Sequence, residues 1–187
     1  MTAKDNTNRN LFLIIMIAIA AIFRVLALYF PSLYNFTPVG AIALFGGVYF
    51  KDKWKGYIVV LATLFFTDLV INYLRTSTIT FGYSVTFWVY LSFALMVLVG
   101  SLIKKVNVLN ILLASTAPVL IHWLLTDLPG ELYPHTLAGY GQSLVAAIPF
   151  EYNLLYGTFV FSAILFGSFE LAKNKYTFLQ DKKQLAL

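Results

Sequence analysis

Six long apolar runs separated by short polar segments make up most of the chain. They cover residues 11–30, 38–50, 56–74, 84–103, 108–128 and 152–172. A helix needs about 20 residues to cross a hydrocarbon core roughly 30 Å thick, and only the second run is clearly shorter. That run begins with Pro38 and is rich in small residues, which allow close contact between helices. The pattern predicts an all-α membrane protein, a single bundle of six transmembrane helices over residues 1–187.

The composition agrees with burial in a bilayer. Of the 187 residues, 60% are hydrophobic and only 11% are charged, and the mean hydropathy is +0.80. About a quarter of the residues are charged in soluble domains, so water is not the main solvent of this chain. Cysteine is absent, which excludes disulfides, thiolate metal sites and thiol catalysis.

The basic residues predict the orientation. Eleven of the 13 lysines and arginines flank alternate ends of the six runs, within residues 4–9, 51–55, 104–105 and 173–183. Cytoplasmic loops of membrane proteins carry an excess of lysine and arginine. We therefore expect both termini in the cytoplasm and a multi-pass location in a bacterial inner membrane, with the lipid bilayer as surroundings. Because the net charge of +5 follows this topology, it does not indicate a nucleic-acid partner.

Three segments are then expected to face outward, at residues 31–37, 75–83 and 129–151. The last segment contains Pro134, Gly139 and Gly141, which make a continuous helix unfavourable there. We expect a break in this segment, with at most a short interfacial or re-entrant helix over residues 142–148.

Polar side chains gather in the outer halves of the predicted helices. Arg24, Asp68 and His122 each lie six residues from the outer end of a run, which is about 9 Å at 1.5 Å per residue. Nearer the same surface lie Asn72, Trp88, Trp123, Thr126, Asp127, Glu151 and Asn153. A charge at the bilayer centre costs about 3 kcal/mol, so such groups normally face a bundle interior. We expect a cavity that opens outward above an apolar floor.

Helical spacing supports this shared interior. Asp68, Asn72 and Arg75 follow one another at four and three residues, so they share one helix face. Trp123 and Asp127 are likewise four residues apart.

Each of these groups also has a purely structural interpretation. Arg24 and Asp68 can form an ion pair that joins two helices, because charges within a membrane need partners. His122 can hydrogen-bond a neighbouring helix. Tryptophans and acidic groups near the interface can be anchors or solvated helix ends. The sequence leaves these alternatives open.

The residues give little support for catalysis or for a metal. Asp127, Glu131 and His135 are spaced by four, but Pro129 and Pro134 interrupt the helix that would align them. With two histidines in the chain, we expect no metal site and no cofactor. No serine stands in a nucleophile motif, and no phosphate-cradling loop of the Walker type is present. We expect a chain that is not an enzyme and does not hydrolyse ATP.

Two segments resemble those of a known family. FTPVGAIALFGGVYF (36–50) and HWLLTDLPGELYPHTLAGYGQSLVAAIPF (122–150) look like an uncharacterised bacterial six-helix membrane family. That family is grouped with the substrate-binding (S) components of energy-coupling factor (ECF) transporters, which the overall plan of the chain also resembles. The resemblance implies capture of a vitamin or other micronutrient beneath the loops after helices one, three and five. It also implies a separate membrane energising subunit with two ATPases as partners.

One feature departs from that resemblance. S components often carry an Ala-x-x-x-Ala docking pattern on the first helix, and the alanines of the first run do not provide this spacing. Ala43 and Gly47 in the second run are four residues apart and are a candidate substitute.

These observations favour a ligand-binding transport subunit. The expected site residues are Arg24, Asp68, Asn72, Trp88, His122, Trp123, Asp127 and Tyr133. The charged and amide groups would bind polar parts of a small solute, and the aromatic rings would stack on its apolar part. Two alternatives stay open: a structural or assembly factor without a small ligand, and an intramembrane enzyme that uses His122 with Asp127.

Overall fold

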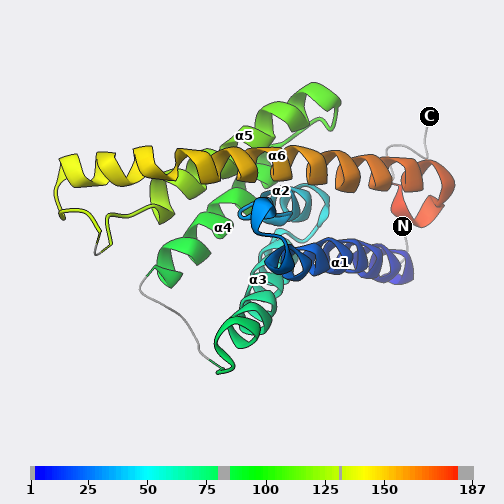
Figure 1. Ribbon diagram of the computed structural model, residues 1–187. Helices are drawn as coiled ribbons and strands as arrows, with labels where there is room; N and C mark the ends of the chain where they lie inside the picture. The colour runs from blue at the N-terminus through cyan, green and yellow to red at the C-terminus, as the bar shows by residue number, and fades with distance from the viewer. Residues whose placement is uncertain (1–2, 80–84, 131, 181–187) are drawn as a thin grey trace.

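The computed structural model describes residues 3–79, 85–130 and 132–180, which form helices and no strand (Figure 1). The helices are α1 (Ala3–Leu26), η1 (Ala27–Tyr29), η2 (Pro31–Leu33), α2 (Val39–Tyr49), α3 (Lys53–Thr76), α4 (Thr86–Leu102), α5 (Val108–Thr126), α6 (Leu137–Lys175) and η3 (Thr177–Leu179), where η marks a single 3₁₀ turn. Over the described residues, the prediction of an all-α protein with six α-helices is confirmed.

Four of these helices are long and apolar enough to cross a membrane: α1, α3, α5 and α6. Helix α2 has 11 residues and α4 has 17, which correspond to about 16 Å and 26 Å. Both are shorter than the roughly 30 Å of hydrocarbon. The chain is therefore a helical membrane protein by the length and composition of four helices, and the count of six crossings stays a prediction.

Helix α2 forms the centre of the molecule. Nine of its 11 residues are buried, and it contacts all five other α-helices. It lies in the middle of the view in Figure 1. Because this helix is apolar on every side, it is stable only when other helices cover it.

Glycines allow the backbones of α2 and α4 to come into direct contact. A Cβ atom on Gly47 would lie 2.2 Å from the carbonyl oxygen of Val97, and one on Gly100 would lie 2.4 Å from that of Leu44. No side chain fits in these positions. Small residues at helix crossings are typical of membrane bundles, where packing holds helices together.

The candidate docking residues on α2 are buried inside the bundle. Ala43 has no exposed surface and Gly47 is buried against α4. These residues stabilise the interior of the bundle, and a partner subunit cannot reach them without unfolding it.

The beginning of α1 and the end of α6 meet at one end of the bundle. The rings of Phe12 and Phe169 lie 6.2 Å apart, and η3 folds back onto α1 with Leu179 fully buried. Figure 1 shows both ends on the same side of the molecule. The number of crossings and the orientation in the membrane stay predictions.

Helix α6 corrects the expected break in segment 129–151. It runs without interruption for 39 residues from Leu137, about 58 Å. The side-chain oxygen of Thr136 accepts a hydrogen bond from the Gly139 backbone and caps the helix. Gly139 is part of the tight first turn, since a Cβ there would lie 1.9 Å from the Pro134 carbonyl oxygen. Pro149 lies inside the helix, and packing against α5 supports this region.

Replacement of Gly47 by alanine is expected to destabilise the protein, because the added methyl group would press on the α4 backbone. Overpacking of this kind costs about 1–3 kcal/mol. Thermal unfolding of the purified protein in detergent would show it as a lower Tm. Gly167→Ala is the matched control, since nothing lies within 4 Å of a Cβ at that position. Equal Tm values for the two variants would contradict the close α2–α4 contact.

Candidate functional site

A cavity of about 420 Å³ lies beneath the segment that joins α1 to α2. All six α-helices contribute to its wall. Its polar lining residues are Arg24, Tyr34, Asn35, Thr37, Asp68, Asn72, Arg75 and His122. Leu154 of α6 and Phe93 of α4 belong to its apolar lining. Four of the eight expected site residues therefore meet around one space: Arg24, Asp68, Asn72 and His122.

Residues 27–38, here called the cover, form one wall of this cavity. The 3₁₀ turns η1 and η2 fold the cover into a compact loop, closed by hydrogen bonds from the Phe30 and Tyr34 backbone nitrogens. Asn35 has a φ of 62°, a left-handed conformation that asparagine tolerates better than most residues. The side-chain amide of Asn153 donates a 2.9 Å hydrogen bond to the Tyr34 carbonyl oxygen and ties the cover to α6.

The other two expected loops contribute less to the cavity. Arg75, at the end of α3, is part of the lining. Residues 80–84 of the second loop lie outside the described residues. No described residue of the third segment, 129–151, lines the cavity.

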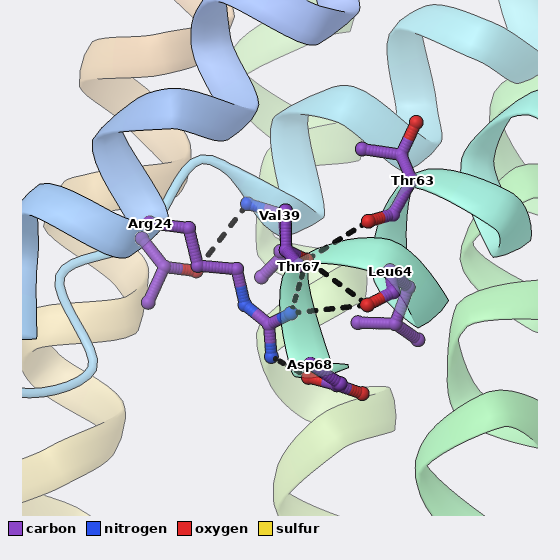
Figure 2. A network of polar contacts seen from close by, with 7 residues as sticks. Arg24, Val39, Thr63, Leu64, Thr67 and Asp68 are labelled. Carbon is purple, nitrogen blue, oxygen red and sulfur yellow. Dashed lines mark hydrogen bonds and ion pairs between the residues drawn. The ribbon is translucent and has the colours of Figure 1, made fainter. Parts of the chain in front are cut away.

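An ion pair joins α1 to α3 at the cavity wall. A guanidinium nitrogen of Arg24 lies 2.6 Å from a carboxylate oxygen of Asp68. A second nitrogen donates a 2.6 Å hydrogen bond to the Thr67 hydroxyl and a 3.5 Å one to the Leu64 carbonyl (Figure 2). The side chains are 18% and 17% exposed. The pair that the sequence left open is formed, and both of its members also line the cavity.

The charges of the lining favour an anionic group. Arg24 and Arg75 carry two positive charges and Asp68 carries one negative charge, so these three residues give the lining a formal net charge of +1. The Asn72 amide, one turn before Arg75, offers both a donor and acceptors. This combination suits a solute with a carboxylate or phosphate group beside neutral polar groups.

Trp88, Trp123, Asp127 and Tyr133 do not line this cavity. The indole nitrogen of Trp123 instead donates a 2.8 Å hydrogen bond to the Leu144 carbonyl of α6. Trp88 packs edge-on against the neighbouring Phe87 ring, and Tyr133 is half-buried in the connection before α6. The structure thus places none of these aromatic residues where they would stack on a solute in the cavity.

A second polar cluster lies between α5 and α6. The Nδ1 atom of His122 is 2.9 Å from a carboxylate oxygen of Glu151, and Asp127 is the third member. The structural alternative for His122, a hydrogen bond to a neighbouring helix, is therefore realised. Glu151 was expected in the outer polar layer, with a solvated helix end as the structural alternative, and its residue is 6% exposed. Glu151 is 29 residues from His122 in the sequence, so no local sequence pattern indicated their contact.

The fold and the cavity define a class: a helical membrane protein with a polar cavity in the end of its bundle. The chain belongs to a protein family described as "Family of unknown function (DUF6580)", whose model matches residues 4–183. No curated protein and no solved structure matches the chain.

Replacement of Asp68 by asparagine is expected to lower the Tm, because it leaves the Arg24 guanidinium mostly buried without its counter-charge. With both side chains partly exposed, the loss should be about 1–3 kcal/mol, less than for a fully buried pair. The double variant Arg24→Gln/Asp68→Asn should lose less than the sum of the two single variants. Strictly additive losses in thermal unfolding would contradict a direct ion pair.

Proposed function

We propose that this protein is the solute-binding subunit of an uptake transporter and captures a small micronutrient in the cavity beneath the cover. The observation that carries the proposal is the convergence of polar side chains from three helices on one space of about 420 Å³. This volume is within the range of about 300–1,000 Å³ found for small-molecule sites. A bundle stabilised only by packing would have no need of such a space.

The lining selects the chemical class of the solute. Arg75 and the Arg24–Asp68 pair would bind an anionic group, and the Asn72 amide would bind a neutral polar group. Aromatic and aliphatic side chains, including Phe93 and Leu154, would cover the apolar part. We propose a vitamin or vitamin precursor that carries a carboxylate or phosphate.

The cover gives the solute a path in and out. Its second half is anchored to the bundle: Asn153 donates to the Tyr34 carbonyl, Phe36 packs on the Phe161 ring, and the Thr37 backbone contacts Gly157 closely. Its first half, residues 27–33, is folded mostly by local backbone hydrogen bonds, and a segment with few tertiary anchors opens at a lower free energy than the packed helices. In this proposal residues 27–33 move, and the helical wall keeps its shape.

The energy for uptake would come from other subunits, because the sequence contains no phosphate-cradling loop. By its resemblance to S components, the chain would work with a membrane energising subunit and its ATPases. The buried positions of Ala43 and Gly47 leave α1 as the candidate docking helix, since Ile15, Ile19 and Ile22 project from it with 47%, 64% and 57% of their surface exposed.

One observation favours the alternative of a non-catalytic structural or assembly factor. The Arg24 guanidinium already has three partners within the protein: Asp68, Thr67 and the Leu64 carbonyl. With these partners Arg24 would join α1 to α3 without needing a solute. In that case a partner protein would stabilise the bundle and no solute would.

Ligand-dependent thermal stabilisation separates these functions. A panel of carboxylate- and phosphate-bearing vitamins and precursors is added to the detergent-purified protein, and at least one should raise the Tm. A ligand at 100 times its Kd stabilises a protein by about 2.7 kcal/mol. Asn72→Ala should abolish the response, whereas Asn174→Ala, at an exposed position in the last turn of α6, should keep it.

Two results would contradict solute binding in this cavity. If no compound shifts the Tm, and mass spectrometry of the purified protein detects no small molecule, the solute-binding function is wrong. If one compound stabilises the wild type and Asn72→Ala equally, the ligand binds elsewhere.

A further inference from the structure

The cluster between α5 and α6 is held in a rigid frame. His122 lies in α5, Asp127 follows that helix directly, and Glu151 lies two residues after Pro149 in α6. Three hydrogen bonds join residues 123–128 to the part of α6 that precedes Glu151: Trp123 to the Leu144 carbonyl at 2.8 Å, Tyr140 to the Leu124 carbonyl at 2.5 Å and Ser143 to the Leu128 carbonyl at 3.2 Å. The three side chains are therefore positioned by the fold itself.

Two carboxylate oxygens of the cluster have no hydrogen-bond partner in the part of the chain that the structure describes. Glu151 is 6% exposed, and its second carboxylate oxygen has no hydrogen-bond partner among the described residues. The same is true of one carboxylate oxygen of Asp127. A buried acceptor without a partner costs about 1–3 kcal/mol, and more if it is charged. Two such oxygens on adjacent carboxylates point to a cation that would satisfy both.

The donor set and its dimensions suit a metal. One imidazole nitrogen and two carboxylate oxygens lie within 4.8 Å of one another. Two ligands that are each about 2.1 Å from a tetrahedral zinc ion are about 3.4 Å apart, so a pair at the upper limit of 4.8 Å would have to approach by about 1.4 Å, shared between two side chains. Imidazole favours first-row transition metals, whereas Mg²⁺ and Ca²⁺ prefer all-oxygen surroundings.

We propose that His122, Asp127 and Glu151 bind a divalent first-row transition-metal cation such as Zn²⁺ or Mn²⁺. The sequence suggested a different and unfavourable trio. Of that trio, Asp127 belongs to the site, His135 is exposed, and Glu131 lies outside the described residues. Three protein ligands leave at least one coordination position for water or another ligand.

The metal site would share a residue with the solute cavity. His122 belongs to both the cluster and the cavity lining. Metal binding would replace the His122–Glu151 hydrogen bond with two metal–ligand bonds and displace any proton that the pair shares. It would fix the His122 ring and hold α5 against α6. The proposal rests on this geometry and does not require the solute-binding function.

Direct binding measurements test the proposal on the whole protein. The chain is purified in detergent with an affinity tag that contains no histidine, stripped with a chelator and dialysed. Zn²⁺ and Mn²⁺ are then titrated separately by isothermal calorimetry, with Mg²⁺ for comparison. We expect about one transition-metal ion per chain, a raised Tm and no saturable binding of Mg²⁺. Absence of saturable Zn²⁺ and Mn²⁺ binding would overturn the proposal.

Paired variants locate the ion. Glu151→Gln and Asp127→Asn keep the shape of each side chain and should each weaken binding roughly 10-fold or more. His122→Asn should do the same, and its matched control His135→Asn should bind as the wild type does. If His135→Asn loses the metal while Glu151→Gln retains it, the site is elsewhere and the proposal is wrong.

The metal affinities of the variants are compared only for variants that fold correctly. Each variant is first tested for a single symmetrical peak in size-exclusion chromatography. Should Glu151→Gln fail this check, Asp127→Asn decides the outcome, because Asp127 follows the end of α5 and contributes less to the helix packing. Normal affinity in a well-folded Asp127→Asn would contradict the proposed ligand set.

Discussion

Charged and polar side chains inside an apolar bundle must find partners within the protein, and this constraint organises the structure. It pairs Arg24 with Asp68 across α1 and α3, and His122 with Glu151 across α5 and α6. Neither pair is fully enclosed, since Arg24, Asp68 and His122 also line the cavity. The central helix α2 begins at Val39, directly after the cover, and this first residue is part of the same lining.

The sequence predicted the features that follow from position along the chain: the helices, the depth of polar residues within them and the helix face on which each residue lies. Hydrophobic run lengths located all six helices, and the depth of Arg24, Asp68 and His122 along their runs predicted a common polar layer. The i,i+4 spacing correctly placed Asn72 on the face of Asp68. These predictions succeed because a helix has a fixed rise and period, so position along the chain converts directly into depth and direction.

Contacts between residues that are distant in the sequence could not be predicted. Trp123 has the right depth for a solute cavity, but its indole group donates to the α6 backbone. Gly139 suggested a break, but it lies in the first turn of α6 because Thr136 caps that helix and the chain approaches closely there. Glu151 contacts His122 because the 39-residue α6 packs along α5. Local propensity carries no information on such tertiary contacts.

Water access to the polar layer is the central claim, and thiol labelling tests it most directly. The chain contains no cysteine, so single replacements give an unambiguous signal. A membrane-impermeant maleimide is applied to intact cells that express either Asn72→Cys, in the cavity wall, or Leu64→Cys, at a buried position two turns earlier on the same helix. Rapid labelling of Asn72→Cys and none of Leu64→Cys is expected. If both positions stay unlabelled in well-folded protein, the cavity is closed to the outside and the account is contradicted.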